Sequence, residues 1–481
     1  MKTKKLVSAI LVLCLSAALF CGCSRTNNYG LDPNAPTTIT IWHYYNGVQQ
    51  EYFDKLLRQF NETVGREMGI VVDGHNKNTI NDLADSAVAA LRGDPGAEEA
   101  PDMFAAYAGT AYTADQLGRV ADVSKYFTEE ELSEYVEEYL EEGNIDDDGE
   151  LKIFPVAKST EVAMVNLTAW QPFADAEGVT EADLSTWEGV AQVAEKYYNY
   201  TDALTPDVPN DGEAFFGRDA VANYMVVGGK QLGMQFVKEE DGNLVLDVDK
   251  DAVRRMWNCY YDPYVRGYFL SSGRYRSDDA QVGKIIAMVC STPGSTYFPQ
   301  VVTLDDEHTY PIESLVLPVP NFEGTDPYIV QQGAGMVVVK SDEKTEYACT
   351  VFLKWFTEQE RSIAFSTSSG YLPVKKDTDF DDIAEAFETE DDALLPVMEM
   401  ALSEINTYEL YVSKPYKNAD DVRAFLDTYI QDTAQQAHDE AAARIEAGED
   451  RNDVLAQYLS DGAFDAWYED FIAGLQAAAG I

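Results

Sequence analysis

Alternating apolar and polar positions predict an α/β arrangement at the start of the folded body. The β-branched residues of Thr37–Trp42 (TTITIW) predict a strand, and apolar positions three and four apart in Val48–Phe60 predict a helix with one buried face. A second strand opens at Val71, a helix closes at Gly93, and Pro101–Ala106 reads as a third strand. Strand, helix, strand, helix, strand is typical of a right-handed parallel unit, whose ligand crevice lies at the carboxyl ends of its strands.

A short polar segment interrupts the apolar pattern in Gly149–Asn166 (GELKIFPVAKSTEVAMVN). Leu151–Val156 predicts a strand, Lys158–Thr160 is polar, and a second strand-like run follows. Taken alone, the polar tripeptide fits an ordinary solvated loop. It also fits a crossing between two packed bodies, with side chains facing a cleft. Similar changes around residues 331–335 and 370–373 predict two further crossings, which favours the second interpretation.

The amino terminus has the pattern of an exported lipoprotein. Three lysines precede the apolar run Leu6–Phe20, which is too short to span a bilayer comfortably and predicts an export signal over residues 1–22. Leu19–Cys23 (LFCGC) resembles the lipobox of bacterial lipoproteins, which implies a lipid on Cys23. Residues 23–36 are polar with Gly and Pro, so we expect a flexible tether. We therefore expect a body that its lipid anchor alone holds at the extracellular face of a bacterial membrane.

Charge and cysteine content narrow the class of function. Removing the signal and its three lysines leaves 32 basic residues against 84 acidic ones, a formal charge of −52. Such a body repels nucleic acid and anionic surfaces. Beyond the signal and lipobox, Cys259, Cys290 and Cys349 are too scattered for a disulfide framework or a metal site. Length predicts two or three lobes, and we expect no metal and no cofactor.

Motifs for catalysis are weak. The four histidines are scattered, and no G-x-S-x-G sequence occurs. Ser341–Lys344 fits S-x-x-K but is better explained as a helix start. Asn144–Gly149 mimics the front of a calcium loop, yet position twelve falls on Pro155 where a glutamate is needed, so we expect a turn. No carboxylate pair stands out among 84 acidic residues, and we expect no enzyme.

Aromatic residues gather in the loops assigned to the crevice. Flat rings with a polar tip suit sugar rings, because they cover the C–H face while hydroxyl groups reach the sugar's hydroxyls. For Trp42, at a strand end, a place in the core is equally compatible with the pattern. The residues concerned are Trp42, Tyr44, Tyr45, Tyr107, Tyr112, Tyr297 and Tyr371.

Seven motifs in a fixed order carry a family resemblance, which within the mature chain covers residues 37–374. They are the lipobox, ITIWH with its helix, PDMFAAYAGTA, FPVAKSTEVAMVN, IIAMVCSTPGS, VQQGAGMVVVKSDEKTEYACTVFLKWFT and SSGYLPV. In this order the chain resembles family 1 extracellular solute-binding proteins, the substrate-binding lipoproteins of ABC importers, and is similar to maltose-binding protein. The resemblance implies a monomer of two α/β lobes, a class II periplasmic-binding-protein-like fold, with three crossings and hinge closure on a ligand.

The resemblance also implies domain limits and ligand contacts. It places residues 37–157 and 333–372 in the first lobe, and residues 158–332 and 373–481, with a helix-rich carboxyl end, in the second. Carried over by position and joined to aromatic residues of the crevice loops, the expected ligand contacts are Trp42, Tyr44, Asn46, Tyr107, Gly109, Lys158, Ser159, Arg218, Ser291, Ser295, Gly333 and Tyr371.

These expectations predict a receptor that captures a neutral carbohydrate, an oligosaccharide by the family pattern, and delivers it to an ABC permease. A receptor for glycerol 3-phosphate or a glycerophosphodiester is the main alternative. The glycerophosphate-binding branch has a carboxylate where this chain has Tyr107, which counts against that alternative. Two further functions fit the sequence less well: a surface glycoside hydrolase, and a sugar-binding adhesin without a permease.

Overall fold

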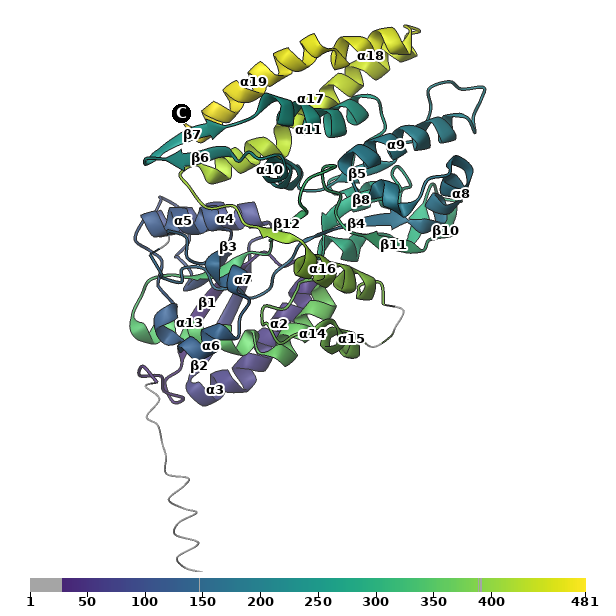
Figure 1. The fold of residues 1–481 in the computed structure, drawn as a ribbon. Helices are drawn as coiled ribbons and strands as arrows, with labels where there is room; N and C mark the ends of the chain where they lie inside the picture. The colour runs from purple at the N-terminus through teal and green to yellow at the C-terminus, as the bar shows by residue number, and fades with distance from the viewer. Residues whose placement is uncertain (1–27, 147, 388, 390–391) are drawn as a thin grey trace, which may run out of the picture.

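Two four-stranded sheets, each flanked by helices, divide the molecule into a first and a second lobe (Figure 1). The computed structural model describes residues 28–481 except 147, 388, 390 and 391. Cys23 and the predicted export signal lie outside the described residues. The two sheets confirm the predicted two-lobed α/β fold.

The first lobe is built on the predicted parallel unit. Its sheet has the order β13-β3-β1-β2, in which β1 is parallel to both β2 and β3, while β13 is antiparallel to β3. The strands are β1 (Thr37–His43), β2 (Ile70–Asn76), β3 (Met103–Ala106) and β13 (Gly335–Val338). The helices are α2 (Gly47–Glu62), α3 (Val64–Met68), α4 (Ile80–Arg92), α5 (Ala108–Gln116), α6 (Glu129–Ser133), α7 (Glu137–Glu141), α13 (Glu343–Phe356) and α14 (Gln359–Ser369).

The second lobe has a mixed sheet of order β11-β4-β8-β5. Its strands β5 and β8 are parallel, so both end at the same edge, where the antiparallel β4 begins. The strands are β4 (Glu161–Asn166), β5 (Phe216–Arg218), β8 (Ala287–Ser291) and β11 (Ser314–Leu317). The helices are α8 (Leu167–Glu177), α9 (Trp187–Asp202), α10 (Val221–Gln231), α11 (Lys250–Val265), α12 (Arg276–Gln281), α15 (Phe380–Ala386) and α16 (Leu395–Thr407).

Three carboxyl-terminal helices cover the second lobe, with α18 and α19 on the side away from the first lobe (Figure 1). Buried Leu426 and Ile430 of the long α17 join the core of this lobe. The helices are α17 (Ala419–Glu446), α18 (Arg451–Leu459) and α19 (Asp461–Ala479), and three short 3-10 helices span Ser124–Tyr126, Glu181–Leu184 and Gly294–Tyr297. Three small two-stranded sheets pair β6 (Phe236–Glu240) with β7 (Asn243–Asp247), β9 (Val301–Thr303) with β10 (Thr309–Pro311), and β12 (Tyr328–Val330) with β14 (Glu409–Tyr411).

The structure corrects two predicted elements. Leu151–Val156 is not a strand: Phe154 makes a single isolated bridge with Met336, because Pro155 next to it has no N–H to continue a ladder. The carboxyl end, expected to be rich in helices, also contains a strand, because β14 pairs in parallel with β12. Three residues are too few to show an alternating pattern, and Leu410 of β14 packs against the cores of both lobes.

Two predicted boundaries also differ. The predicted tether is packed from residue 28 onward: Tyr29 lies against the ring of Tyr347 with 4.4 Å between centroids, and Leu31 is buried in the first core. The stretch after residue 372 does not pass at once to the second lobe. The N–H of Val136 donates to the carbonyl of Val374, which is fully buried in the first core. Apolar contact therefore keeps both segments on the first lobe.

The acidic loop that mimics a calcium site is a turn, as predicted. Asn144 Oδ1 accepts a hydrogen bond from the N–H of Gly149 at 3.1 Å, which closes the loop. The ammonium of Lys152, which is buried, bonds Asp146 at 2.7 Å and Asp148 at 3.0 Å. A lysine thus holds the carboxylates of this loop together.

Candidate functional site

The three predicted crossings lie side by side and are joined by backbone hydrogen bonds. Lys158 of the first crossing exchanges two bonds with Leu372 of the third, and Ser159 exchanges two with Gln332 of the second. Gly333 has a φ of +89°, and a Cβ there would lie 2.5 Å from the carbonyl oxygen of Ala157. Only glycine fits so close to the first crossing. The polar tripeptide of the sequence is therefore the middle of a three-segment hinge.

A buried ion pair crosses this hinge. The Lys158 ammonium contacts the Glu142 carboxylate, which follows α7, and donates to the carbonyl of Gly333 at 3.0 Å. Gln331 donates to the same Glu142 oxygen at 2.9 Å. The Lys158 side chain is only 1% exposed. The Lys158 ammonium thus holds the crossings together through Glu142 and Gly333. Contact of Lys158 with a ligand stays a prediction.

Tyrosines from both lobes meet beside the hinge. The hydroxyls of Tyr44, after β1, and Tyr371, in the third crossing, are 3.0 Å apart. Tyr107, after β3, is half-buried and close enough to both to influence their ionisation. Tyr297, after β8 of the second lobe, is exposed, and its hydroxyl would lie 3.5 Å from a Cβ on Gly47. Three strand-end loops and one crossing therefore converge.

Phenols are protonated at neutral pH, and burial reinforces this for three members of the cluster. It raises the pKa of Tyr44 and of Tyr371 well above that of a free tyrosine, and the electrostatic effect of Tyr107 raises both further. Burial also raises the pKa of Tyr107. A protonated phenol both donates and accepts a hydrogen bond. The cluster thus offers neutral hydroxyls and aromatic faces at neutral pH.

The facing edge of the second lobe carries a buried polar network. Arg218, at the end of β5, donates to both oxygens of Glu161 at 2.7 and 2.9 Å. Asn223 of α10 donates to Glu161 at 2.8 Å and accepts from Arg423 of α17 at 2.7 Å. Glu161 begins β4 directly after the first crossing. Arg218 therefore lies near the hinge with its guanidinium paired, and its predicted contact with a ligand stays a prediction.

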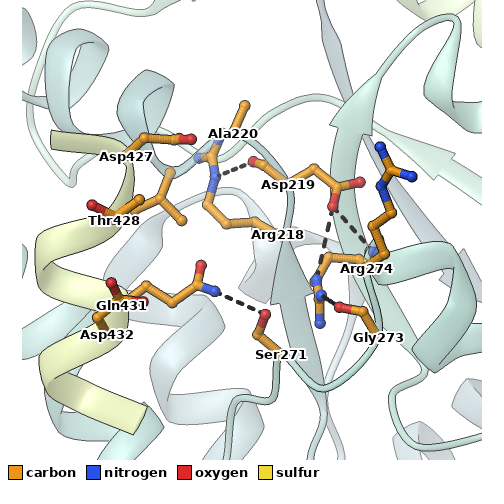
Figure 2. Close-up of a pocket in the computed structure, with 12 residues that line it drawn as sticks. Arg218, Asp219, Ala220, Ser271, Gly273, Arg274, Asp427, Thr428, Gln431 and Asp432 are labelled. Carbon is orange, nitrogen blue, oxygen red and sulfur yellow. Dashed lines mark hydrogen bonds and ion pairs between the residues drawn. The ribbon is translucent and has the colours of Figure 1, made fainter. Parts of the chain in front are cut away.

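A polar cavity of about 230 Å³ lies beside Arg218. Figure 2 shows Arg218 and Asp219 on one wall and Gln431 of α17 on the opposite wall, where it bonds Ser271. Burial raises the pKa of Asp219 to about 6, and the positive charge of Arg276 opposes this rise. The cavity thus extends the polar edge of the second lobe under α17.

The remaining predicted contact residues are either buried or hydrogen-bonded to neighbouring groups of the chain. Trp42 is 2% exposed and belongs to the core of the first lobe, which is the alternative to a ligand contact that its place at a strand end allowed. The Lys77 ammonium lies 3.9 Å from the centroid of its ring. Asn46 is exposed and bonds the carbonyls of Tyr44 and Asn78. The hydroxyls of the serines bond locally. Ser291 Oγ accepts from Gly294, and Ser295 Oγ donates to Thr292. Ser159 is buried in the hinge.

Gly109 shows what sequence reasoning missed. A Cβ on Gly109 would lie 2.0 Å from Oδ1 of Asp420, the second residue of α17. Asp420 thus reaches the predicted loop from more than 300 residues away, and Arg423 acts electrostatically on Tyr107 beside it. Nothing in the helical pattern of residues 419–446 marks them. Glu161 and Asn223 were missed as well, although both lie in segments assigned to the crevice side.

Comparisons with known proteins agree with this fold. A cyclic α-maltosyl-1,6-maltose binding protein from Arthrobacter globiformis is 18% identical, with a TM-score of 0.64, and the match covers 92% of this chain and 100% of that one. UgpB from Mycobacterium tuberculosis, solved with glycerophosphocholine, is 16% identical, with a TM-score of 0.62 and coverage of 88% and 100%. The lacto-N-biose-binding protein of a Bifidobacterium longum ABC transporter is 14% identical, with a TM-score of 0.63 and coverage of 94% and 99%.

No curated protein sequence matches the chain. Within the described residues, none of the helices has both the length and the apolar content needed to cross a membrane. The family model for bacterial extracellular solute-binding proteins matches residues 55–393, which is most of the chain. The predicted family is therefore confirmed: the chain belongs to the bacterial extracellular solute-binding proteins.

Proposed function

We propose that this protein is the substrate-binding lipoprotein of an ABC importer and captures a neutral carbohydrate between its lobes. The observation that carries the proposal is the convergence of Tyr44, Tyr107, Tyr297 and Tyr371 from both lobes and the hinge. Aromatic faces cover the C–H surfaces of sugar rings, and phenol hydroxyls bond sugar hydroxyls. Solved structures of the same fold were obtained with maltotriose, lacto-N-biose and glycerophosphocholine.

The charge state of the site favours an uncharged ligand. A buried phosphate needs a cation or several N–H groups to offset its lost hydration. The two cations predicted for this site are both paired, Lys158 with Glu142 and Arg218 with Glu161. Drawing either one to a phosphate would leave its buried carboxylate unpaired, which is costly. The glycerophosphate alternative is thus the weaker one.

The family indicates a role in solute transport, and our proposal adds a lipid anchor and an ABC permease partner. The protein binds its ligand without changing it, hands it to the transmembrane subunits of an ABC permease, and works as a monomer. A lipid on Cys23 holds it at the outer face of the membrane. Hinge closure around the ligand brings the two lobes together by rotation about the three crossings.

A thermal-shift screen of the mature protein against a glycan panel that includes maltotriose and lacto-N-biose tests the ligand class. A ligand at about 100 times its Kd stabilises the folded state by roughly 2.7 kcal/mol. Calorimetry then gives the affinity of each hit. We expect Tyr107→Ala to weaken binding and Tyr275→Ala, which changes an exposed tyrosine of the second lobe, to leave it unchanged.

Two results would contradict the proposal. Release of new reducing ends from a glycan would indicate a hydrolase. Tight binding of glycerol 3-phosphate that Lys158→Ala abolishes, with no glycan bound, would favour the phosphate receptor.

A further inference from the structure

The first turn of α17 stands between the two lobes at the tyrosine cluster. Downstream of Asp420, Val422 and Leu426 of this helix are buried in the core of the second lobe. Asp420 keeps part of its surface in solvent, but its carboxyl group lies against α5 of the first lobe, where Thr110 Oγ donates to its Oδ2 at 3.4 Å. A helix of the second lobe thus places a carboxylate against the loop that follows β3 of the first.

The absence of a side chain at Gly109 gives the carboxylate its place. An ideal Cβ at position 109 would lie 2.0 Å from Asp420 Oδ1, so a larger residue there would push the carboxylate aside. Asp420 also lies beside the first turn of α5, whose N-terminal end is partly positive. The carboxylate therefore lies where the start of α5 favours a negative charge.

The cation near Asp420 is Arg423, whose hydrogen bond goes to the second lobe. Arg423, one turn along α17, donates to Asn223, which bonds Glu161. Arg423 acts electrostatically on both Asp420 and Tyr107, lowering the pKa of each against the larger effect of burial. Asp420 thus neutralises the positive potential that Arg423 and the start of α5 would otherwise present to a ligand.

We propose that Asp420 is a specificity-determining residue that restricts the interlobe site to uncharged ligands. The inference rests on the proposed function, because it concerns the ligand site of the same receptor. An incoming anion would meet a carboxylate at contact distance, and like charges at an interface oppose binding strongly. A hydroxyl group would instead find an acceptor. The same carboxylate that excludes phosphate suits a polyol.

The test compares Asp420→Ala with Asp421→Ala, a matched control that removes the same charge from the neighbouring exposed residue. Each mature full-length variant and the native protein are titrated by calorimetry with inorganic phosphate and with glycerophosphocholine. Asp420→Asn, which keeps the shape of the side chain, serves if the alanine variant folds poorly. The glycan panel is run on the native protein in parallel.

We expect phosphate to bind Asp420→Ala at least about tenfold more tightly than the native protein or Asp421→Ala, and more weakly as salt is added. Adding Arg423→Gln should remove most of this gain. Equal phosphate affinity in all three proteins, or a gain that survives Arg423→Gln, would overturn the inference. If the native protein binds no glycan, the proposed function fails, while the phosphate titrations still decide the role of Asp420.

Discussion

Replacing Lys158 by methionine distinguishes a hinge role from a ligand role. The ammonium is 1% exposed, and its partner Glu142 is 9% exposed. Methionine keeps much of the side-chain volume but leaves the Glu142 carboxylate without its cation and the Gly333 carbonyl without its donor. We therefore expect the main effect on the free energy of unfolding.

The contacts of Glu142 determine how much Lys158→Met lowers the free energy of unfolding. Breaking a buried ion pair by removing one partner costs about 3–5 kcal/mol. Gln331 still donates to Glu142 at 2.9 Å, which offsets roughly 1 kcal/mol of the loss. We expect Lys158→Met to lower the free energy of unfolding by about 2–4 kcal/mol. Adding Glu142→Gln should cost less than the sum of the two single changes, because the pair is coupled.

Urea unfolding followed by circular dichroism and by tryptophan fluorescence measures the loss. Agreement of the two probes shows whether the lobes unfold together, which a single free energy requires. Lys417→Met, at an exposed lysine, is the matched control. Native-like stability of Lys158→Met together with lost ligand affinity would refute the hinge role and restore the ligand contact predicted from sequence.

Changes at the tyrosine pair, at Glu404, in the bound ligand and at Cys23 give further expected results. Tyr371→Phe removes the hydroxyl pair with Tyr44 and should cost about 1 kcal/mol of stability, whereas Tyr371→Ala should weaken glycan binding by roughly 1–3 kcal/mol in calorimetry, and an unchanged affinity would remove this ring from the site. Burial raises the pKa of Glu404 to about 8. The stability that its protonated form contributes is therefore fully present below the ordinary glutamate pKa and is lost as the pH rises toward 8. Glu404→Gln should flatten the dependence of the unfolding free energy on pH between 5 and 8, and parallel curves for the two proteins would contradict this. A saturating glycan should lower the radius of gyration in small-angle scattering, and an unchanged value would indicate a rigid body. Cys23→Ala should abolish lipid labelling, and normal labelling would place the anchor elsewhere.

The first lobe was largely predictable because its signals are local. Alternation in residues 37–42 and helical spacing in residues 48–60 correspond to β1 and α2. Thr79 and Asp82 form a capping box at the start of α4, and Gly93 closes this helix in the left-handed conformation, where the sequence predicted its end. Local chemistry of this kind acts within a few residues, so the chain shows it directly.

The site was predictable only where it depends on strand ends and crossings. Tyr44 and Tyr107 follow strands, and Tyr371 lies in a crossing, so the pattern of the sequence marked the position of all three. The pairing of Lys158 and Arg218 was not foreseen, since 84 acidic residues offer too many candidate partners. Asp420 lies on an ordinary amphipathic helix, and its contact with Thr110 depends on packing between elements 310 residues apart.

The loop around Lys152 bears on the conditions in which the protein works. A loop with the carboxylates of a calcium site normally needs the ion to keep those charges together. Here the neutralising charge is covalently part of the chain, as the ammonium bonded to Asp146 and Asp148. An extracellular protein meets divalent ions at levels that its host does not control. Because this loop carries its own counterion, we expect its shape to be the same with and without added calcium or chelator.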